Sequence, residues 1–152
     1  YQLSSLGIAA VFHDIGKTEI PLSILNKPSG FNPKEIELIM RHPVEGVKAL
    51  VRAKDLSDIS IISMLVSFEH HLNYDNTGYP ELSRKRTPNI FSRIISIADY
   101  YDALTSGKIY GRVAYTPENA LKSIYEKSGN AFDPILTRVF INMLAGNSPR
   151  SQ

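Results

Sequence analysis

The stretch around which the rest of this chain can be interpreted reads His70-His71-Leu72-Asn73-Tyr74-Asp75-Asn76-Thr77-Gly78-Tyr79-Pro80. Two adjacent imidazoles stand at the end of an apolar run that has helical spacing. Turn-forming residues follow, together with an acid and two tyrosines. Imidazole is the commonest metal ligand among side chains, and loops positioned by a rigid scaffold often carry binding residues. We therefore expect a helix that ends at a metal site and opens into a functional loop.

Three other segments offer partners for this histidine pair, namely His13 with Asp14, then His42, and downstream Asp99. All 4 histidines of the chain lie in these short segments, each at a predicted helix end or break. The chain has no cysteine, which excludes a thiolate site and a disulfide. Imidazole and carboxylate ligands without sulfur favour Fe or Mn over Zn or Ni. Two such metals sharing a carboxylate can activate water for a phosphoryl displacement.

Apolar periodicity predicts an all-α fold, since no stretch shows strand alternation and no repeat is found. The expected helices cover residues 3–14, 33–42, 44–51, 58–70, 90–104, 117–125 and 134–144. Four residues are expected to cap helices, because each precedes a Pro or an apolar run: Asn32, Asp58, Thr116 and Asp133. The proline in His42-Pro43 is expected to break a helix. We expect an irregular connection from Pro21 to Pro28 and a loop from residue 72 to 88.

Length and composition are those of one globular domain. The chain has 152 residues, 43% of them hydrophobic and 21% charged, and no apolar run reaches the length of a membrane span. A formal net charge of +2 is too small for a dedicated binder of nucleic acid polymers. We expect a cytoplasmic domain over residues 1–146, lacking its first helices because the chain opens on helix-like residues, and a frayed tail over 147–152.

Several blocks, in order along nearly the whole chain, resemble the HD-GYP branch of the HD phosphohydrolase superfamily. They are His13-Asp14-Ile15-Gly16-Lys17, His42-Pro43, His70-His71, Gly78-Tyr79-Pro80, Asp99, Asp102-Ala103-Leu104-Thr105-Ser106 and Phe132-Asp133-Pro134. The resemblance implies an HD-domain helical bundle of about six to seven helices. It also implies two or three divalent metal ions and a phosphodiesterase that hydrolyses cyclic di-GMP to pGpG or GMP in bacterial signalling.

The same resemblance implies roles for individual residues. The implied metal ligands are His13, Asp14, His42, His70, His71 and Asp99, with Asp14 as the bridge. Asp14 and Lys17 would be catalytic, with Lys17 beside the scissile phosphate. The implied substrate contacts are Lys17, Gly78, Tyr79, Pro80, Lys108 and Arg112. The loop at residues 78–80 could also dock diguanylate cyclase domains, and a homodimer is a further option.

Structural readings of the same residues stand beside the functional ones. Lys17 could be a solvated helix-end lysine, which suits the helix dipole, and Tyr79 could simply support the loop. The run Arg84-Lys85-Arg86 could be a solvated rim, although it lies close enough to the loop to attract a phosphate-rich substrate.

The chain also departs from the family pattern. Leu72 replaces a Glu that usually follows the histidine pair, and Asn76 replaces a Gly. Glu69 precedes the pair on a different helical face, so it is not an automatic substitute. The family's basic pair near the nucleotide phosphates falls on Lys108 and Gly111, with Arg112 one place later. Two alternatives therefore stay open: a degenerate domain that binds nucleotide or protein without turnover, and a phosphohydrolase acting on another nucleotide.

Overall fold

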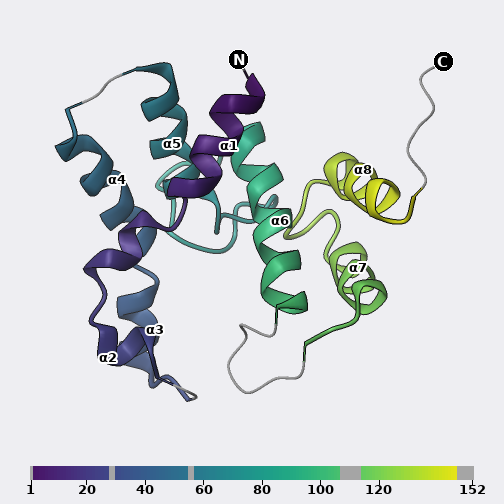
Figure 1. Cartoon of the computed structure of the whole chain (residues 1–152), viewed down its shortest axis with the longest axis horizontal. Coiled ribbons are helices and arrows are strands. Elements are labelled where there is room, and N and C mark those ends of the chain that lie inside the picture. The colour runs from purple at the N-terminus through teal and green to yellow at the C-terminus, as the bar shows by residue number, and fades with distance from the viewer. Residues whose placement is uncertain (1, 28–29, 55–56, 107–113, 147–152) are drawn as a thin grey trace.

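A computed structural model describes residues 2–27, 30–54, 57–106 and 114–146, and this part of the chain is all-α, as predicted (Figure 1). Seven α-helices of seven or more residues are found in it: α1 Gln2–Phe12, α3 Pro33–Ile39, α4 His42–Arg52, α5 Asp58–Glu69, α6 Ile90–Thr105, α7 Pro117–Glu126 and α8 Pro134–Leu144. A 3-10 helix, η1 Ile15–Glu19, follows α1. None of the described helices is long and apolar enough to cross a membrane.

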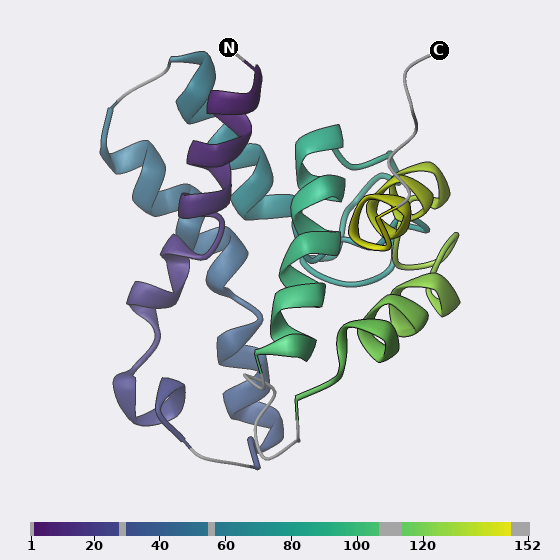
Figure 2. The same cartoon turned by 45° about the vertical axis from the view of Figure 1, so that its right-hand side comes forward.

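Helix α6 stands between two groups of helices, with α1, α4 and α5 on one side and α7 and α8 on the other (Figures 1 and 2). On one face of α6, buried Ile95 packs with Ala9 of α1 and Val66 of α5. On another face, buried Ile97 packs with Ile124 of α7. Burying a large aliphatic side chain stabilises by about 1.5–3 kcal/mol, so these clusters fix both groups against α6.

Most predicted caps are confirmed. Asn32 forms a capping box with Glu35, in which Asn32 Oδ1 accepts from the Glu35 N–H at 3.0 Å and Glu35 Oε2 accepts from the Asn32 N–H at 2.7 Å. Thr116 and Asp133 accept from backbone N–H groups at the starts of α7 and α8. Each cap contributes on the order of 1 kcal/mol, which explains why these helix starts are readable from sequence.

Two helix boundaries differ from prediction. The break before α4 lies at Met40–Arg41, and His42 is already the first helical residue. Pro43 is tolerated at the second position because the first N–H groups of a helix have no intrahelical partner. The cap of α5 is Ser57, whose side chain accepts from the Ser60 N–H, and Asp58 is the first helical residue.

The connection predicted to be irregular between Pro21 and Pro28 contains a single helical turn, α2 Leu22–Leu25. The Pro21 carbonyl accepts from the N–H groups of Ile24 and Leu25, which closes this turn. A turn of four residues is too short for apolar periodicity to reveal, and the prediction was wrong there.

Close approach of backbones brings η1, α4 and α5 together. A Cβ added to Gly16 in η1 would lie 1.9 Å from the His42 carbonyl oxygen and 2.4 Å from the Gly46 nitrogen. A Cβ added to Gly46 in α4 would lie 2.2 Å from the Ser67 hydroxyl oxygen of α5. Glycine has no side chain at either position, so the segments that carry His13, Asp14 and His42 can pack side by side.

We predict that Gly16→Ala destabilises the fold, because the new methyl group must push η1 away from α4. Overpacking of this kind costs about 1–3 kcal/mol in the free energy of unfolding. The matched control is Gly7→Ala, since Gly7 lies within α1 with nothing within 4 Å of an added Cβ. That change should stabilise by about 0.5–1 kcal/mol. Urea unfolding followed by circular dichroism measures both, and equal effects of the two changes would contradict the proposed close contact.

Candidate metal centre

Asp14 lies at the junction of α1 and η1, with its carboxylate among three imidazoles. Its Oδ1 lies 3.3 Å from His42 Nε2 and 3.6 Å from His70 Nε2. Its Oδ2 lies 3.2 Å from His13 Nε2. One carboxylate thus faces side chains from the end of α1, the start of α4 and the end of α5.

Three of the imidazoles are oriented by backbone carbonyl groups. Nδ1 of His13 lies 2.6 Å from the Ala10 carbonyl oxygen, and Nδ1 of His42 lies 2.7 Å from that of Ile39. Nδ1 of His70 lies 2.9 Å from the Ser67 carbonyl oxygen. A carbonyl can only accept, so each Nδ1 carries a hydrogen, and in the neutral form of each ring the Nε2 lone pair faces the centre. This is the arrangement in which outer hydrogen bonds orient a metal-binding histidine.

The potential ligand atoms form two groups that share Asp14. One group comprises Asp14, His42, His70 and His71, and the other comprises His13, Asp14 and Asp99. Within each group the ligand atoms lie within 4.8 Å of one another. The structure therefore brings together all six predicted ligands, and Asp14 belongs to both groups.

Two buried atoms of this cluster, His13 Nε2 and Asp14 Oδ1, have no hydrogen-bond partner. Buried polar groups are normally satisfied, because leaving one unpaired costs free energy. A cation bound at each group would satisfy both atoms. The residues present thus fit two divalent cations held by nitrogen and oxygen.

The two adjacent histidines are held neutral by their surroundings. Burial lowers the pKa of His70, and burial together with the nearby His70 and His42 lowers the pKa of His71 to about 2. A neutral imidazole keeps its lone pair available for a metal ion. Both residues are therefore ready to coordinate a cation at neutral pH.

The other half of the cluster holds more negative charge. Although burial opposes each shift, the close imidazoles of His13, His42 and His70 and the ammonium group of Lys17 hold the pKa of Asp14 well below its usual range, and His13 similarly lowers that of Asp99. Against the opposing effect of burial, the close carboxylates of Asp14 and Asp99 raise the pKa of His13 to about 10. A proton on His13 thus supplies the positive charge that balances the carboxylates of Asp14 and Asp99, a role that a bound cation could otherwise take.

Lys17 approaches the same centre from η1. Its Nζ donates to Asp14 Oδ2 at 2.5 Å, while 42% of its side chain stays exposed. The lysine is therefore an ion-pair partner of the central carboxylate rather than a fully solvated residue. From this position its ammonium group can also reach an anion that enters the site.

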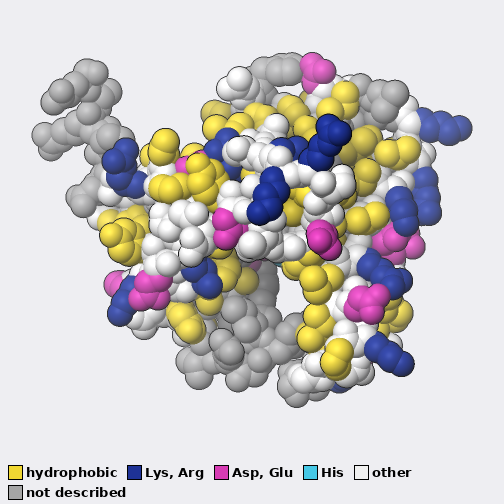
Figure 3. All heavy atoms as spheres, turned by 180° about the vertical axis from the view of Figure 1, so that it is seen from behind, with side chains coloured by type: hydrophobic (Ala, Val, Ile, Leu, Met, Phe, Trp, Pro, Cys, Tyr) yellow, Lys and Arg dark blue, Asp and Glu magenta, His cyan; other side chains and the backbone are white. Residues whose placement is uncertain are grey.

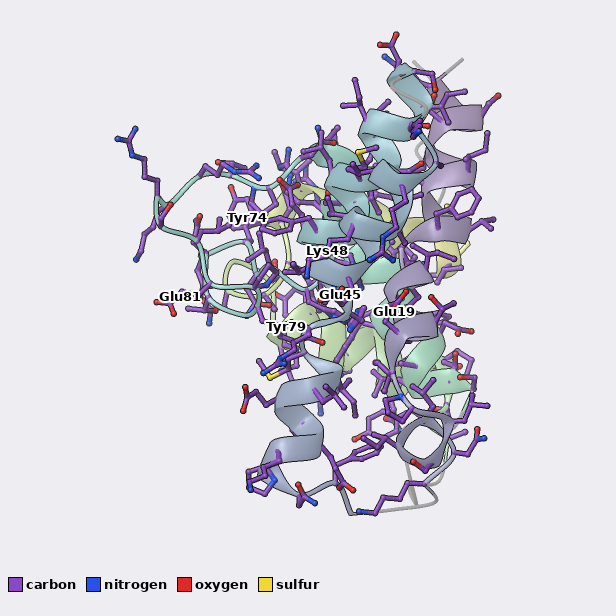
Figure 4. All side chains as sticks on the ribbon, turned by 90° about the vertical axis from the view of Figure 1, so that its left-hand side faces the viewer. Glu19, Glu45, Lys48, Tyr74, Tyr79 and Glu81 are labelled. Atoms are coloured by element: carbon purple, nitrogen blue, oxygen red, sulfur yellow. The ribbon has the colours of Figure 1, made fainter. Side chains whose placement is uncertain are left out.

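The loop at residues 78–80 folds back over the histidine pair. The Tyr79 ring stacks on the His71 ring with centroids 4.5 Å apart, and the backbone N–H of Tyr79 donates to the His71 carbonyl oxygen at 3.2 Å. Gly78 has φ of +88°, and a Cβ there would lie 2.3 Å from the same carbonyl oxygen, so only glycine fits. In Figure 4, Tyr79 lies at the inner edge of the loop, whereas Glu81 points away from the molecule. Pro80, next along the chain, is half-buried.

Glu69 fastens this loop at its base. Its carboxylate is fully buried, and Oε2 accepts from the Asn89 N–H at 2.7 Å and from the Ser92 hydroxyl at 2.8 Å. Oε1 forms an ion pair with the guanidinium of Arg86, and the Arg86 N–H donates to Asn76 Oδ1 at 2.7 Å. Arg86 stays partly exposed, with 47% of its side chain accessible, yet its guanidinium also pairs with a fully buried carboxylate, which a purely solvated rim would not do.

The departures from the family pattern have local explanations. Asn76 adopts φ of +67°, a left-handed conformation that asparagine tolerates better than most residues, so the backbone that glycine would favour is kept. Leu72 is buried and apolar, and the Glu69 carboxylate is directed to α6 and Arg86 instead of the imidazoles. Glu69 thus does not replace the missing Glu. The predicted contacts Lys108 and Arg112, and the departure at Gly111, lie outside the described residues.

Comparison with known proteins agrees with this geometry. The sequence profile of the HD domain family matches residues 2–136. The chain belongs to the HD domain family. It is 34% identical over 136 residues to a cyclic di-GMP phosphodiesterase of Vibrio cholerae, covering 88% of this chain and 27% of that protein. It is also 34% identical over 135 residues to a cyclic di-GMP phosphodiesterase of Pseudomonas aeruginosa, covering 89% and 31%.

Another HD-family relative is named for a different cyclic dinucleotide. A 3′3′-cGAMP-specific phosphodiesterase of Vibrio cholerae is 31% identical over 133 residues, covering 88% of this chain and 25% of that protein. This HD chain therefore spans only about a quarter to a third of the length of these relatives.

We predict that replacing Arg86 with Met loosens the HD-domain loop, because the buried Glu69 carboxylate loses its counter-charge. The free energy of unfolding should fall by roughly 1–3 kcal/mol, and amide exchange over residues 72–89 should speed up. The control is Lys85→Met, an exposed neighbour. Adding Glu69→Gln to Arg86→Met should recover part of the loss, since a neutral amide needs no counter-ion. Equal behaviour of the Lys85 and Arg86 variants would contradict the role given to this ion pair.

We also predict that metal binding releases protons. The pKa of His13 is raised to about 10, so at pH 6–8 its imidazolium must lose a proton before Nε2 can coordinate. Affinity for Mn²⁺ should therefore rise with pH, by about tenfold per unit for each proton displaced. Calorimetry in two buffers of different ionisation enthalpy counts the released protons. In His13→Gln binding should be weaker and this proton should no longer be released. Wild-type affinity that is independent of pH would contradict the prediction.

Proposed function

We propose that this HD domain hydrolyses a cyclic dinucleotide, with cyclic di-GMP as the first candidate, in metal-dependent phosphodiester cleavage. The observation that carries the proposal is the sharing of Asp14 between two groups of ligand atoms, which is the arrangement a two-metal centre requires. The names of the relatives support the substrate class, since similar identities link the chain to enzymes named for cyclic di-GMP and for 3′3′-cGAMP.

The residues that would hold the metals follow from the two groups. Asp14, His42, His70 and His71 would hold one ion, and His13, Asp14 and Asp99 the other. When bound, the pair supplies activation of water and polarisation of the phosphoryl group. The nitrogen and oxygen ligand set favours Fe or Mn over Zn or Ni. A third ion, as the family resemblance suggests, would need ligands beyond these six.

The chain's own side chains would complete the reaction. The Asp14 carboxylate would set the spacing of both ligand groups. The carbonyl groups that accept from Nδ1 of His13, His42 and His70 would keep each Nε2 directed at the centre. Lys17 would leave Asp14 to contact the phosphate oxygens, where its ammonium stabilises the developing charge and can give a proton to the leaving oxygen. Tyr79, stacked on His71, would contact the nucleotide and limit entry of water.

Leu72 is the departure among the described residues that favours binding without turnover, the alternative left open by the sequence, but all six ligands are retained and lie together, which favours hydrolysis. A cytoplasmic location and docking of diguanylate cyclase domains on residues 78–80 stay predictions.

We predict that the chain supplied with Mn²⁺ or Fe²⁺ converts cyclic di-GMP to linear pGpG or GMP. Asp14→Asn should reduce the rate by more than roughly 100-fold, since even outer-sphere partners of metal ligands are worth about 10–100-fold. The control is Asp58→Asn, the same change at an exposed position at the start of α5. Liquid chromatography of the products measures both. Absence of product with either metal, or full activity of Asp14→Asn, would overturn the proposed function.

A further inference from the structure

Two cavities share one lining residue, Tyr79. The first has a volume of about 410 Å³ and reaches the centre through His70, His71 and Asp99. The second has a volume of about 400 Å³ and includes Lys17. Tyr79 lines both cavities. Each has the size of a small-molecule site, and together they flank the candidate metal centre.

The second cavity is apolar apart from its inner end. Five of its seven lining residues are apolar and come from α2, α3 and the segment around them: Leu25, Phe31, Ile36, Ile39 and Met40. Lys17 closes the inner end, with its Nζ 2.5 Å from Asp14 Oδ2. Ile36 and Met40 are 45% and 38% exposed, which is high for side chains of this kind on a folded domain. Lys17 therefore links this cavity to the candidate metal centre, and the exposed side chains leave the cavity open to a ligand.

The figures agree with this placement. In Figure 4, Tyr79 lies just above helix α3, close to the end of that helix. In Figure 3, seen from behind, hydrophobic side chains gather on the part of this face that holds α2 and α3, and no histidine is visible there.

The first cavity has a different chemistry. Polar side chains of Asn73, Ser96 and Lys127 line it. Lys127 is the one cationic lining residue among those described, and its Nζ lies 5.9 Å from the centre of the Tyr100 ring. Guanine presents two neighbouring acceptors, N7 and O6, whereas adenine presents an acceptor beside an amino donor. An ammonium group therefore favours guanine.

We infer that the two cavities receive the two bases of the cyclic dinucleotide unequally. The apolar cavity beside Lys17 holds one purine and accepts guanine or adenine alike, while Lys127 selects guanine for the other base. A hydrophobic pocket cannot strongly reject a ligand of nearly the same shape, whereas a polar site discriminates by leaving groups unpaired. The inference rests on the proposed function and deepens it, since it says which part of the molecule chooses the base.

The inference gives a definite order of substrates. Cyclic di-GMP and 3′3′-cGAMP should be cleaved with kcat/KM values within about threefold of each other, because each can place guanine at Lys127 and the other purine in the apolar cavity. Cyclic di-AMP should be at least about tenfold poorer, since one adenine must face the ammonium group.

The test is to fill the apolar cavity with Met40→Trp. KM for cyclic di-GMP and for 3′3′-cGAMP should rise by the same factor, roughly tenfold. Metal content, and kcat for the small diester bis(p-nitrophenyl) phosphate, should not change. The control is Val51→Trp, which adds the same bulk at an exposed position in α4 away from both cavities. In parallel, Lys127→Met should lower the ratio of kcat/KM for cyclic di-GMP over cyclic di-AMP by about tenfold, and Lys127→Arg should keep it.

The outcomes separate the inference from the function on which it rests. If the wild-type chain cleaves no cyclic dinucleotide, the proposed function fails and the inference with it. If cleavage occurs but Met40→Trp behaves like Val51→Trp, the base does not bind there, the cavity serves another partner, and only the inference fails. A factor that differs more than about threefold between the two substrates would show that the apolar cavity discriminates, which also overturns the inference.

Discussion

The contact on which this structure depends is that of the Asp14 carboxylate with imidazoles from three helices. For Oδ1 to lie within 3.6 Å of both His42 and His70, the backbones of η1, α4 and α5 must pack more closely than side chains usually permit. Gly16 and Gly46 allow this, since a Cβ at either position would overlap a neighbour. The site and the fold therefore impose the same constraint, and the helices cannot separate without losing the centre.

Much of the fold could be read from sequence because its signals are local. The capping box at Asn32 and the proline at the first position of α7 and α8 act within one helical turn, so they survive without knowledge of the tertiary structure. The six potential ligands could be found for a similar reason, since each lies at a helix end or within a family motif. Their convergence, however, was an expectation from the resemblance, and only the structure gives the two groups that share Asp14.

What the sequence could not reveal depends on contacts between distant segments. Arg86 belongs to a basic run that looks solvated, yet its guanidinium reaches a carboxylate seventeen positions earlier in the chain, as the residue numbers 69 and 86 show. Helical geometry predicts that Glu69 lies on a different face from the histidine pair, but it does not predict the partners of Glu69, which are groups at the start of α6 and the distant Arg86. The apolar cavity was missed as well, because it is assembled from α2, which no periodicity reveals, and α3.

The two inward-facing acids next to the histidines, Glu69 and Asp14, show how a structural carboxylate differs from one suited to a metal. Glu69 is fully buried, and donor groups of the protein face both of its oxygens: an N–H and a hydroxyl at Oε2, and a guanidinium group in an ion pair at Oε1. Asp14 is less buried, yet its Oδ1 has no hydrogen-bond partner and faces imidazole nitrogens that the backbone has already oriented as acceptors. Acceptors facing acceptors repel unless a proton or a cation stands between them. The chain would not keep such an arrangement for stability alone, because an apolar side chain or a matched donor would serve better there. A bound cation would relieve this mismatch, and the mismatch is therefore the strongest physical support for the proposed metal centre.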